Sequence, residues 1–439
     1  MYDLVKQDSR ALQKELTALR REFHQYAEPG WLEMRTASRI ARELKNMGYE
    51  ELILGRDVCL NEARMGVPEE RILREHYVWA EENGADSFYL PYTEGGFTAV
   101  IAVLRCGEGP TVALRFDIDA LGVRESCEEG HLPFDEGFTS VTDGVMHACG
   151  HDGHAAIGLG AAKLLMKYRH MLHGTVKLIF QCAEEGVRGA RSIVEAGHLD
   201  DADYVLGGHI FPTDKAPGAD VTVFREGAQG ALATTKLDLI FRGESVHAGV
   251  SPQLGKNAML AASTAVLNLH AIPRYSSVPT HINVGKFTAG TGRNVVCSEA
   301  RLEVEVRGAT SEANDYMEER AIAIAKAAAG MYDCALDVIY MGGAPSMVCS
   351  GTLSERVRQV AQRQGYNAVS LSGMDGGSED FSFMARRVIE RGGEATFFSL
   401  LTSCAAVNHN DRFDFNEEVL SMGAEIFVST VLDIIGSET

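Results

Sequence analysis

The densest group of reactive side chains in this sequence lies between residues 146 and 154. The segment reads Met-His-Ala-Cys-Gly-His-Asp-Gly-His, and it holds three histidines, one cysteine and one aspartate within eight residues. Imidazole nitrogens and a cysteine thiolate are good ligands for borderline divalent metals. A glycine-rich turn capped by Asp152 would explain a single histidine equally well, but a cluster of this density predicts a metal site.

Carboxylates and two further histidines follow other apolar segments. Glu184 and Glu185 come after a predicted strand that ends at Gln181, and His209 and His409 follow two more. Taken singly, each histidine fits a loop position and the Glu-Glu-Gly segment fits a solvated turn. Parallel strands bind ligands beyond their carboxyl ends, so these side chains are expected at one edge of one sheet. Adjacent carboxylates suit metal-assisted hydrolysis, because one can bind metal while the other accepts a proton from water.

The sequence lacks the motifs that mark other common enzyme mechanisms. The sequence contains no GxSxG segment for a serine nucleophile, no GxxxxGK[ST] loop and no GxGxxG segment after a strand. The 41 lysines and arginines stand against 61 aspartates and glutamates, which gives a formal charge of −20. Nucleic-acid binding needs clustered positive charge, so the composition argues against it.

The length and composition indicate a globular protein of two or three domains, with 439 residues of which 45% are hydrophobic. No apolar run approaches the ~18 residues of a membrane-spanning helix, and the N-terminus has no signal-peptide stretch. The nine cysteines, an odd number without a CxxC pair, do not indicate a disulfide framework. We therefore expect a cytoplasmic protein with no membrane or nucleic-acid partner.

Apolar strands alternate with helices over most of the chain, which predicts a mainly parallel sheet covered on both faces. The expected strands are Ala99–Leu104, Thr111–Leu114, Val176–Phe180, Tyr204–Leu206 and Thr396–Leu400. The expected helices are 8–27, 36–47, 155–168 and 352–364, with a last one from Asn416. Residues 55–92 interrupt this rhythm and are interpreted as an insertion between a helix and a strand.

The middle of the chain has a different pattern. Residues 237–241 and 301–307 alternate between apolar and polar side chains, which indicates an antiparallel sheet with one face exposed. Two helical patterns, at 257–271 and 311–329, accompany these strands. The pattern predicts a two-layer α/β domain at 230–344, inserted into a catalytic domain formed by 1–229 and 345–439.

Seven segments together resemble the M20 metallopeptidases, and more narrowly their amidohydrolase branch. They are ACGHDGH at 148–154, AEEG at 183–186, HI at 209–210, SVHAG at 245–249, GRNVV at 292–296, GSED at 377–380 and NHN…FDFNEE at 408–418. The match covers nearly the whole chain in the family's order. It implies an α/β fold: a mainly parallel-sheet di-metal hydrolase domain, with an inserted two-layer α/β domain that serves as lid and dimerisation domain.

The resemblance also assigns roles around two divalent metal ions per protomer, Mn²⁺ or Zn²⁺. Cys149 matches the bridging ligand, a position held by aspartate in other branches, and the remaining ligands match His151, Glu185, His209 and His409. Glu184 matches the general base, while Asp117 and Asp119 are expected to support the ligands from behind. Ser378, Glu379 and Asp380 fit a simple helix N-cap.

The inserted domain is expected to contribute residues to substrate binding. The family resemblance implies that His247 enters the active site of a partner protomer and polarises the scissile carbonyl. Asn294 and Arg307 match positions that hold the carboxylate end of the substrate, and Arg293 is a further bidentate candidate. From its alternating strand alone, Arg307 fits a surface charge equally well.

Three functions remain open from the sequence. The first is hydrolysis of an aroyl-glutamate, with p-aminobenzoyl-glutamate, a folate breakdown product, as the leading substrate and p-aminobenzoate and glutamate as products. The second is hydrolysis of another N-acyl amino acid by the same groups. The third is a weakly active or binding protein that needs a companion chain. The expected assembly is a homodimer through the lid or a heterodimer with a related chain.

Overall fold

The computed structural model describes residues 2–213, 220–229, 231–373 and 377–437. The chain divides into two compact units. The first comprises Met1–Ala228, Val348–Gly373 and Asp380–Thr439, and the second comprises Gln229–Met347 and Met374–Glu379. The sequence analysis places the domain boundaries at 229/230 and 344/345, and the assignment of the two units as catalytic domain and lid stays a prediction.

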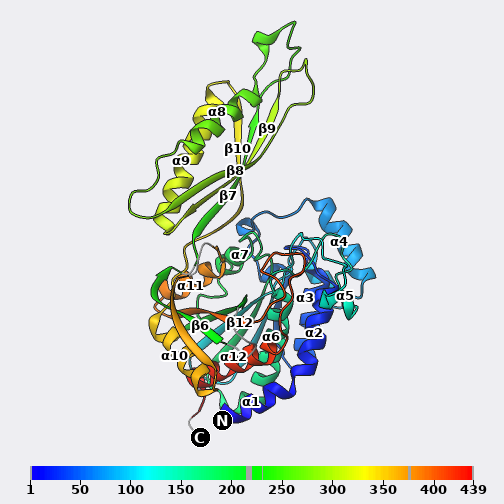
Figure 1. Ribbon diagram of the computed structural model, residues 1–439, viewed down its shortest axis with the longest axis vertical. Helices are drawn as coiled ribbons and strands as arrows, with labels where there is room; N and C mark the ends of the chain where they lie inside the picture. The colour runs from blue at the N-terminus through cyan, green and yellow to red at the C-terminus, as the bar shows by residue number, and fades with distance from the viewer. Residues whose placement is uncertain (1, 214–219, 230, 374–376, 438–439) are drawn as a thin grey trace. The chain divides into compact units, whose positions relative to one another are not determined.

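The first unit contains a sheet of eight strands in the order β1-β2-β4-β3-β5-β12-β6-β11 (Figure 1). Their bounds are β1 Glu51–Leu54, β2 Val100–Arg105, β3 Thr111–Asp117, β4 Thr175–Gln181, β5 Tyr204–Pro212, β6 Asp220–Gln229, β11 Asn367–Gly373 and β12 Glu394–Thr402. The central strands β4, β3, β5 and β12 are parallel, which confirms the expected fold class.

The edges of this sheet are antiparallel. Strand β2 pairs antiparallel with β4 and with β1, and β6 pairs antiparallel with β12. Only residues 106–110 connect β2 to β3. A parallel crossover needs a dozen or more residues, so this short connection makes β2 run opposite to β3 and therefore also to β4, which is parallel to β3.

Helices cover both faces of the central strands. Adjacent residues of a strand face opposite sides of the sheet. In β5, a Cβ on Gly207 would meet Phe381 of helix α11, whereas one on Gly208 would meet Phe427 of helix α12. The helices of this unit are α1 Tyr2–Ala11, α2 Gln13–Gln25, α3 Met34–Asn46, α4 Glu70–Glu82, α5 Leu132–Asp135, α6 His151–Tyr168, α7 Ala190–Glu195, α10 Gly351–Arg363, α11 Phe381–Glu390 and α12 Val419–Ile435.

The N-terminal helix differs from its prediction. The stripe formed by Leu12, Leu16, Leu19 and Phe23 predicted one helix over 8–27, but the chain forms α1 and α2 with a break at Leu12. Leu16, Leu19 and Phe23 are buried as the stripe requires, and α2 packs on α6. The break lets α1 pack along α12 while α2 follows α6.

The second unit is a two-layer domain, as expected. Its strands β7 Ala233–Arg242, β8 Thr280–Ala289, β9 Glu299–Gly308 and β10 Ala335–Ala344 form an antiparallel sheet in the order β10-β7-β9-β8. Helices α8 Ala258–His270 and α9 Ser311–Gly330 pack on it through their alanines. The sequence pattern predicted only β7 and β9, because the edge strands β8 and β10 expose much of both faces.

No helix in the described part of the chain combines the length and the apolar character needed to cross a membrane.

Candidate metal centre

The five predicted metal ligands lie close together in the first unit. Cys149 Sγ is 3.4 Å from His209 Nε2. Glu185 Oε1 lies 4.0 Å from His151 Nε2 and 3.7 Å from His409 Nε2. Cys149 belongs to two groups whose donor atoms all lie within 4.8 Å of one another, one with His151 and His209 and the other with Glu185 and His409. This sharing is the geometry that a bridging ligand requires.

The elements that carry these ligands differ in part from those expected. Glu185 follows β4 and His409 follows β12, as the sequence indicated. His209, however, does not close its strand, because β5 remains paired with β12 as far as Pro212. Cys149 and His151 do not follow a strand directly, since they lie at the start of α6, where Gly150 adopts a φ of 90°.

Two buried atoms at the centre have no hydrogen-bond partner in the structure. They are His151 Nε2 and Glu185 Oε1. The other ring nitrogen of His151, Nδ1, lies 2.9 Å from the backbone oxygen of Asp119. A proton on Nδ1 leaves the lone pair of Nε2 available for a metal. Buried polar atoms rarely lack partners, so the residues present fit a bound cation.

The electrostatics of the cluster point in the same direction. Burial and the neighbouring Glu185 carboxylate raise the pKa of the Cys149 thiol to about 12. Burial also raises the pKa of Glu185 to about 7 and holds the pKa of His209 well below its ordinary value. Burial thus disfavours the charged form of each group. A bound cation would compensate the negative charges of Cys149 and Glu185, and a neutral His209 can donate its lone pair to a metal.

Asp119 holds three of the proposed site residues. Its Oδ1 accepts the backbone N–H of Glu184 at 3.1 Å, and its Oδ2 accepts that of Glu185 at 2.9 Å. Its backbone oxygen is the partner of His151. One buried residue therefore orients a nitrogen ligand and the whole carboxylate pair.

Asp117 acts through a histidine that the sequence reasoning left without a role. His154 Nδ1 lies 2.5 Å from Asp117 Oδ1, and His154 Nε2 accepts the backbone N–H of Ile210 at 2.9 Å. Both ring nitrogens of His154 are thus engaged within the protein. The contact with Ile210 steadies the strand next to His209. The i, i+3 spacing of His151 and His154 on a helix was the signal available in the sequence.

The turn that carries Glu184 and Glu185 is strained and held from two sides. Ala183 has a φ of 51° and Val187 a φ of 58°, which is unusual for residues other than glycine. The buried carboxylate of Glu33 accepts the N–H of Ala183 at 2.7 Å. Arg188 donates to the oxygens of Glu185 and of Gly66, so the 55–92 insertion contacts the turn. No sequence motif indicated that Glu33 or Arg188 would support this turn.

The side chain of Asp380 has a different partner from the one predicted. It was expected to cap its own helix, but it makes no side-chain cap bond to α11. Its Oδ2 instead accepts the N–H groups of Gly189 and Ala190, at 3.1 and 2.9 Å, at the start of α7. Its Oδ1 accepts from Gln181 at the end of β4 at 2.7 Å. A carboxylate distant in sequence thus satisfies the N-terminal amides of α7.

The predicted substrate residues of the second unit form two groups. Ala248 N–H donates to Asn294 O at 2.9 Å, so His247, Arg293 and Asn294 lie on neighbouring exposed segments. Arg307 lies at the far end of β9, where it pairs with Glu305 at 3.0 Å. At ~3.4 Å per residue, β9 from Glu299 to Arg307 alone spans roughly 27 Å. The structure therefore does not bring Arg307 together with Asn294 within one unit.

The fold and the cluster define a metal-dependent hydrolase, and comparison with known proteins agrees. Residues 113–433 match the family model described as peptidase family M20/M25/M40. The chain is 43% identical to an indole-3-acetyl-aspartic acid hydrolase of Enterobacter agglomerans, over 98% of each chain. It is also 43% identical to one of the subunits of p-aminobenzoyl-glutamate hydrolase from Escherichia coli, over 96% of each chain.

Solved structures share the fold along the whole chain. An aminobenzoyl-glutamate utilization protein from Klebsiella pneumoniae has a TM-score of 0.82 at 39% identity, with 97% of each chain covered. A Bacillus subtilis protein described as a dinuclear metal binding peptidase has a TM-score of 0.66 at 25% identity, covering 97% of this chain and 99% of that one. The chain belongs to the M20 peptidase family, which confirms the resemblance.

Proposed function

We propose that this protein hydrolyses the amide bond of an N-aroyl or N-acyl amino acid, with p-aminobenzoyl-glutamate as the leading substrate. The observation that carries the proposal is the cluster around Cys149, in which two donor groups share one thiol next to a second carboxylate, Glu184. The two relatives at 43% identity are named for amides of glutamate and of aspartate. An acidic amino acid as the leaving group is common to both names.

Glu184 is the proposed base. Its side chain is nearly buried, and its Oε2 lies 3.9 Å from His151 Nε2, beside the ligands. Two divalent ions held by Cys149, His151, Glu185, His209 and His409 would polarise the scissile carbonyl and acidify the attacking water. Glu184 takes the proton of that water on its carboxylate and passes it to the leaving nitrogen. Asp119 keeps the carboxylate in place through the backbone of Glu184.

The donor set bears on the identity of the metal. A thiolate ligand favours Zn²⁺ because both are relatively soft, whereas the carboxylate and imidazole ligands also accept Mn²⁺. We propose that one of these two ions supports activity. Adding each ion separately to the metal-free, chelator-treated protein and measuring the recovered activity decides between them.

The lid residues are proposed to act across a dimer. His247 would donate to the scissile carbonyl oxygen in the partner's site, and Asn294, Arg293 and Arg307 would bind the substrate carboxylates. The wide separation of Arg307 from Asn294 along β9 supports a site completed by two lids.

The proposed dimer surface is the edge of the second unit formed by α8 and β8. Leu267 and Leu260 on α8 are 75% and 48% exposed, and Phe287 on β8 is 42% exposed. Exposed apolar surface of this kind is typical of association sites. One relative is named as part of a hydrolase with more than one kind of chain, so a heterodimer with a related chain is the second form of this proposal.

We expect Leu267→Glu to shift the protein from dimer to monomer, because a buried, unpaired carboxylate would face the partner. Sedimentation velocity measures the change, and turnover should fall with the dimer fraction if His247 acts across the interface. Ile339→Glu, at an exposed position on the opposite edge strand β10, is the matched control and should remain dimeric. A Leu267→Glu protein that stays dimeric contradicts the assigned surface.

A substrate panel tests the reaction itself. The purified chain, loaded with Zn²⁺ or Mn²⁺, is assayed with p-aminobenzoyl conjugates of glutamate, aspartate, alanine and leucine and with indole-3-acetyl-aspartate. We expect the highest kcat/KM for the glutamate conjugate. Equal rates on glutamate, alanine and leucine conjugates would refute the glutamate assignment, and preference for indole-3-acetyl-aspartate would favour the other relative's reaction. Activity that depends on a companion chain would favour the heteromeric form.

A cytoplasmic location is part of the proposal. All nine cysteines are free thiols, and Cys149 has to remain reduced to bind metal. A reducing compartment preserves it.

A further inference from the structure

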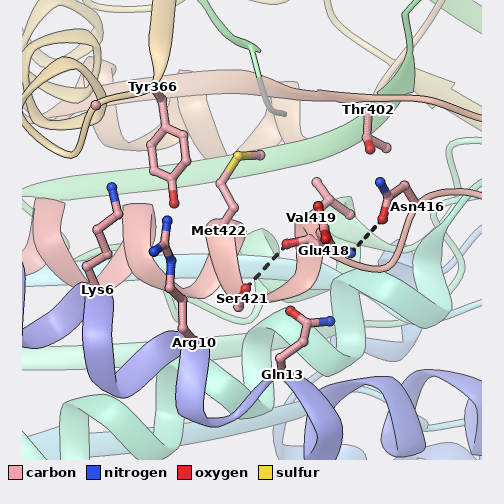
Figure 2. Close-up of a pocket in the computed structure, with 11 residues that line it drawn as sticks. Lys6, Arg10, Gln13, Tyr366, Thr402, Asn416, Glu418, Val419, Ser421 and Met422 are labelled. Carbon is pink, nitrogen blue, oxygen red and sulfur yellow. Dashed lines mark hydrogen bonds between the residues drawn. The ribbon is translucent and has the colours of Figure 1, made fainter. Parts of the chain in front are cut away.

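A second cavity lies on the first unit, and none of the predicted metal ligands lines it (Figure 2). Its volume is about 540 Å³, within the usual range of small-molecule sites. Helices α1 and α12 form two of its walls, and Tyr366, between α10 and β11, forms a third. The proposed function does not use this cavity.

One end of the cavity carries two cations. Lys6 and Arg10 are four residues apart on α1 and therefore share one face of the helix. Figure 2 shows both side chains directed toward Tyr366. Lys6 Nζ donates to Gln364 O and lies 5.1 Å from the centroid of the Tyr366 ring. Arg10 is exposed and has no hydrogen bond or salt bridge to any residue that the structure describes.

A buried carboxyl group, that of Glu425, lies behind this end of the cavity. Glu425 is buried behind Tyr366 and accepts its hydroxyl at 2.6 Å. Burial raises the pKa of Glu425, while the hydrogen bond from Tyr366 and the charges of Lys6 and Arg10 act in the opposite direction. In a chain with a formal charge of −20, Lys6 and Arg10 thus place two positive charges at one end of a cavity.

The other end of the cavity has the opposite character. Asn416, Glu418 and Thr402 line it, and Figure 2 shows them on the far side of Met422 from Lys6. Glu418 is an exposed carboxylate, and its backbone N–H is held by Asn416 Oδ1 at 3.0 Å. A ligand with an anionic group at one end and an amino group at the other complements both ends, whereas a bare phosphate complements only one.

We propose that this cavity binds a free acidic amino acid such as glutamate, with its side-chain carboxylate at Lys6 and Arg10 and its amino group toward Glu418. The inference does not rest on the proposed reaction.

The cavity also contacts the base of the loop that carries His409. Thr402 precedes this loop and Asn416 follows it, and Asn416 N–H donates to Ser403 O at 2.9 Å. A ligand in the cavity would contact both stems of the loop at once. We therefore expect occupancy to slow backbone hydrogen exchange across residues 403–416.

Calorimetric titration of the metal-loaded protein with glutamate tests the proposal. Arg10→Ala should weaken binding by at least about tenfold, the loss expected for one charge-assisted hydrogen bond. Lys14→Ala removes an exposed cation of the next helix that does not line the cavity, and it should bind as the wild type does. The Arg10 side chain makes no hydrogen bond or salt bridge to the described residues, so its removal should leave the fold intact.

Three results would overturn the inference. The first is wild-type affinity for glutamate in Arg10→Ala, which would place the binding elsewhere, for example at the metal centre. The second is unchanged hydrogen exchange at 403–416 when glutamate is bound. The third is tighter binding of inorganic phosphate than of glutamate, which would remove the role of the Glu418 end.

Discussion

The Glu184→Gln protein should keep its metals and its substrate affinity but turn over about 10²- to 10⁴-fold more slowly, the range typical of a lost general base. Glutamine has nearly the same shape as glutamate, and the backbone N–H of residue 184 would still donate to Asp119. Only the capacity to accept a proton is removed. Steady-state kcat and metal content, the latter by plasma mass spectrometry, measure the two effects separately.

The neighbouring carboxylate supplies the matched control. Glu185→Gln changes the same chemical group on the same turn. Glu185 Oε1, however, is one of the two buried atoms at the centre that lack a hydrogen-bond partner, and it lies 3.7 Å from His409 Nε2. This variant should lose metal as well as activity. The base assignment fails if Glu184→Gln retains near-normal kcat, or if its metal content falls as far as that of Glu185→Gln.

Cys149→Ala should lose metal from both positions of the centre. Cys149 is the one residue common to the two donor groups, so its removal takes a ligand from each. Loss of a supporting contact behind a ligand typically costs 10–100-fold in metal affinity, and loss of a shared ligand should exceed about 100-fold. Competition with a chromophoric chelator measures the affinity of each position.

Two variants separate this effect from a general loss of stability. Cys349→Ala also removes a buried thiol, 1% exposed, but from a position outside the cluster, and it should retain full metal content. Cys149→Asp supplies an oxygen ligand and should restore part of the binding, with a shift toward Mn²⁺. One fully loaded metal position in Cys149→Ala would exclude a bridging role.

The clustering of the candidate ligands could be predicted because each of them belongs to a short local pattern. Cys149 and His151 lie in one dense segment, and Glu184 and Glu185 follow a clear apolar strand. Segments that follow neighbouring parallel strands meet at the same edge of the sheet, whatever the lengths of the loops that connect the strands. The two-layer second unit was predictable for a similar reason, since the alternating sequence of β9 matches its alternating burial; β7, in contrast, is buried at nearly every position.

The features that escaped prediction depend on pairs of residues distant in sequence. Glu33 meets Ala183 and Asp380 meets α7 only through the folded chain, so no local spacing marks them. The antiparallel edge at β2 depends on a connection too short for a crossover, and β8 and β10 lack a clean alternation. In each case the observed structure depends on contacts between segments distant in sequence, which a local sequence pattern does not contain.

The position of Asp119 has a consequence for how this centre can change by mutation. Since one carboxylate holds the backbone of both Glu184 and Glu185, and its own backbone holds His151, these residues are energetically coupled. The effects of substitutions among them should therefore depend on one another rather than add. A change of the metal or of the base at this centre would therefore require several substitutions together. Asp119 is the residue on which their combined effects would depend.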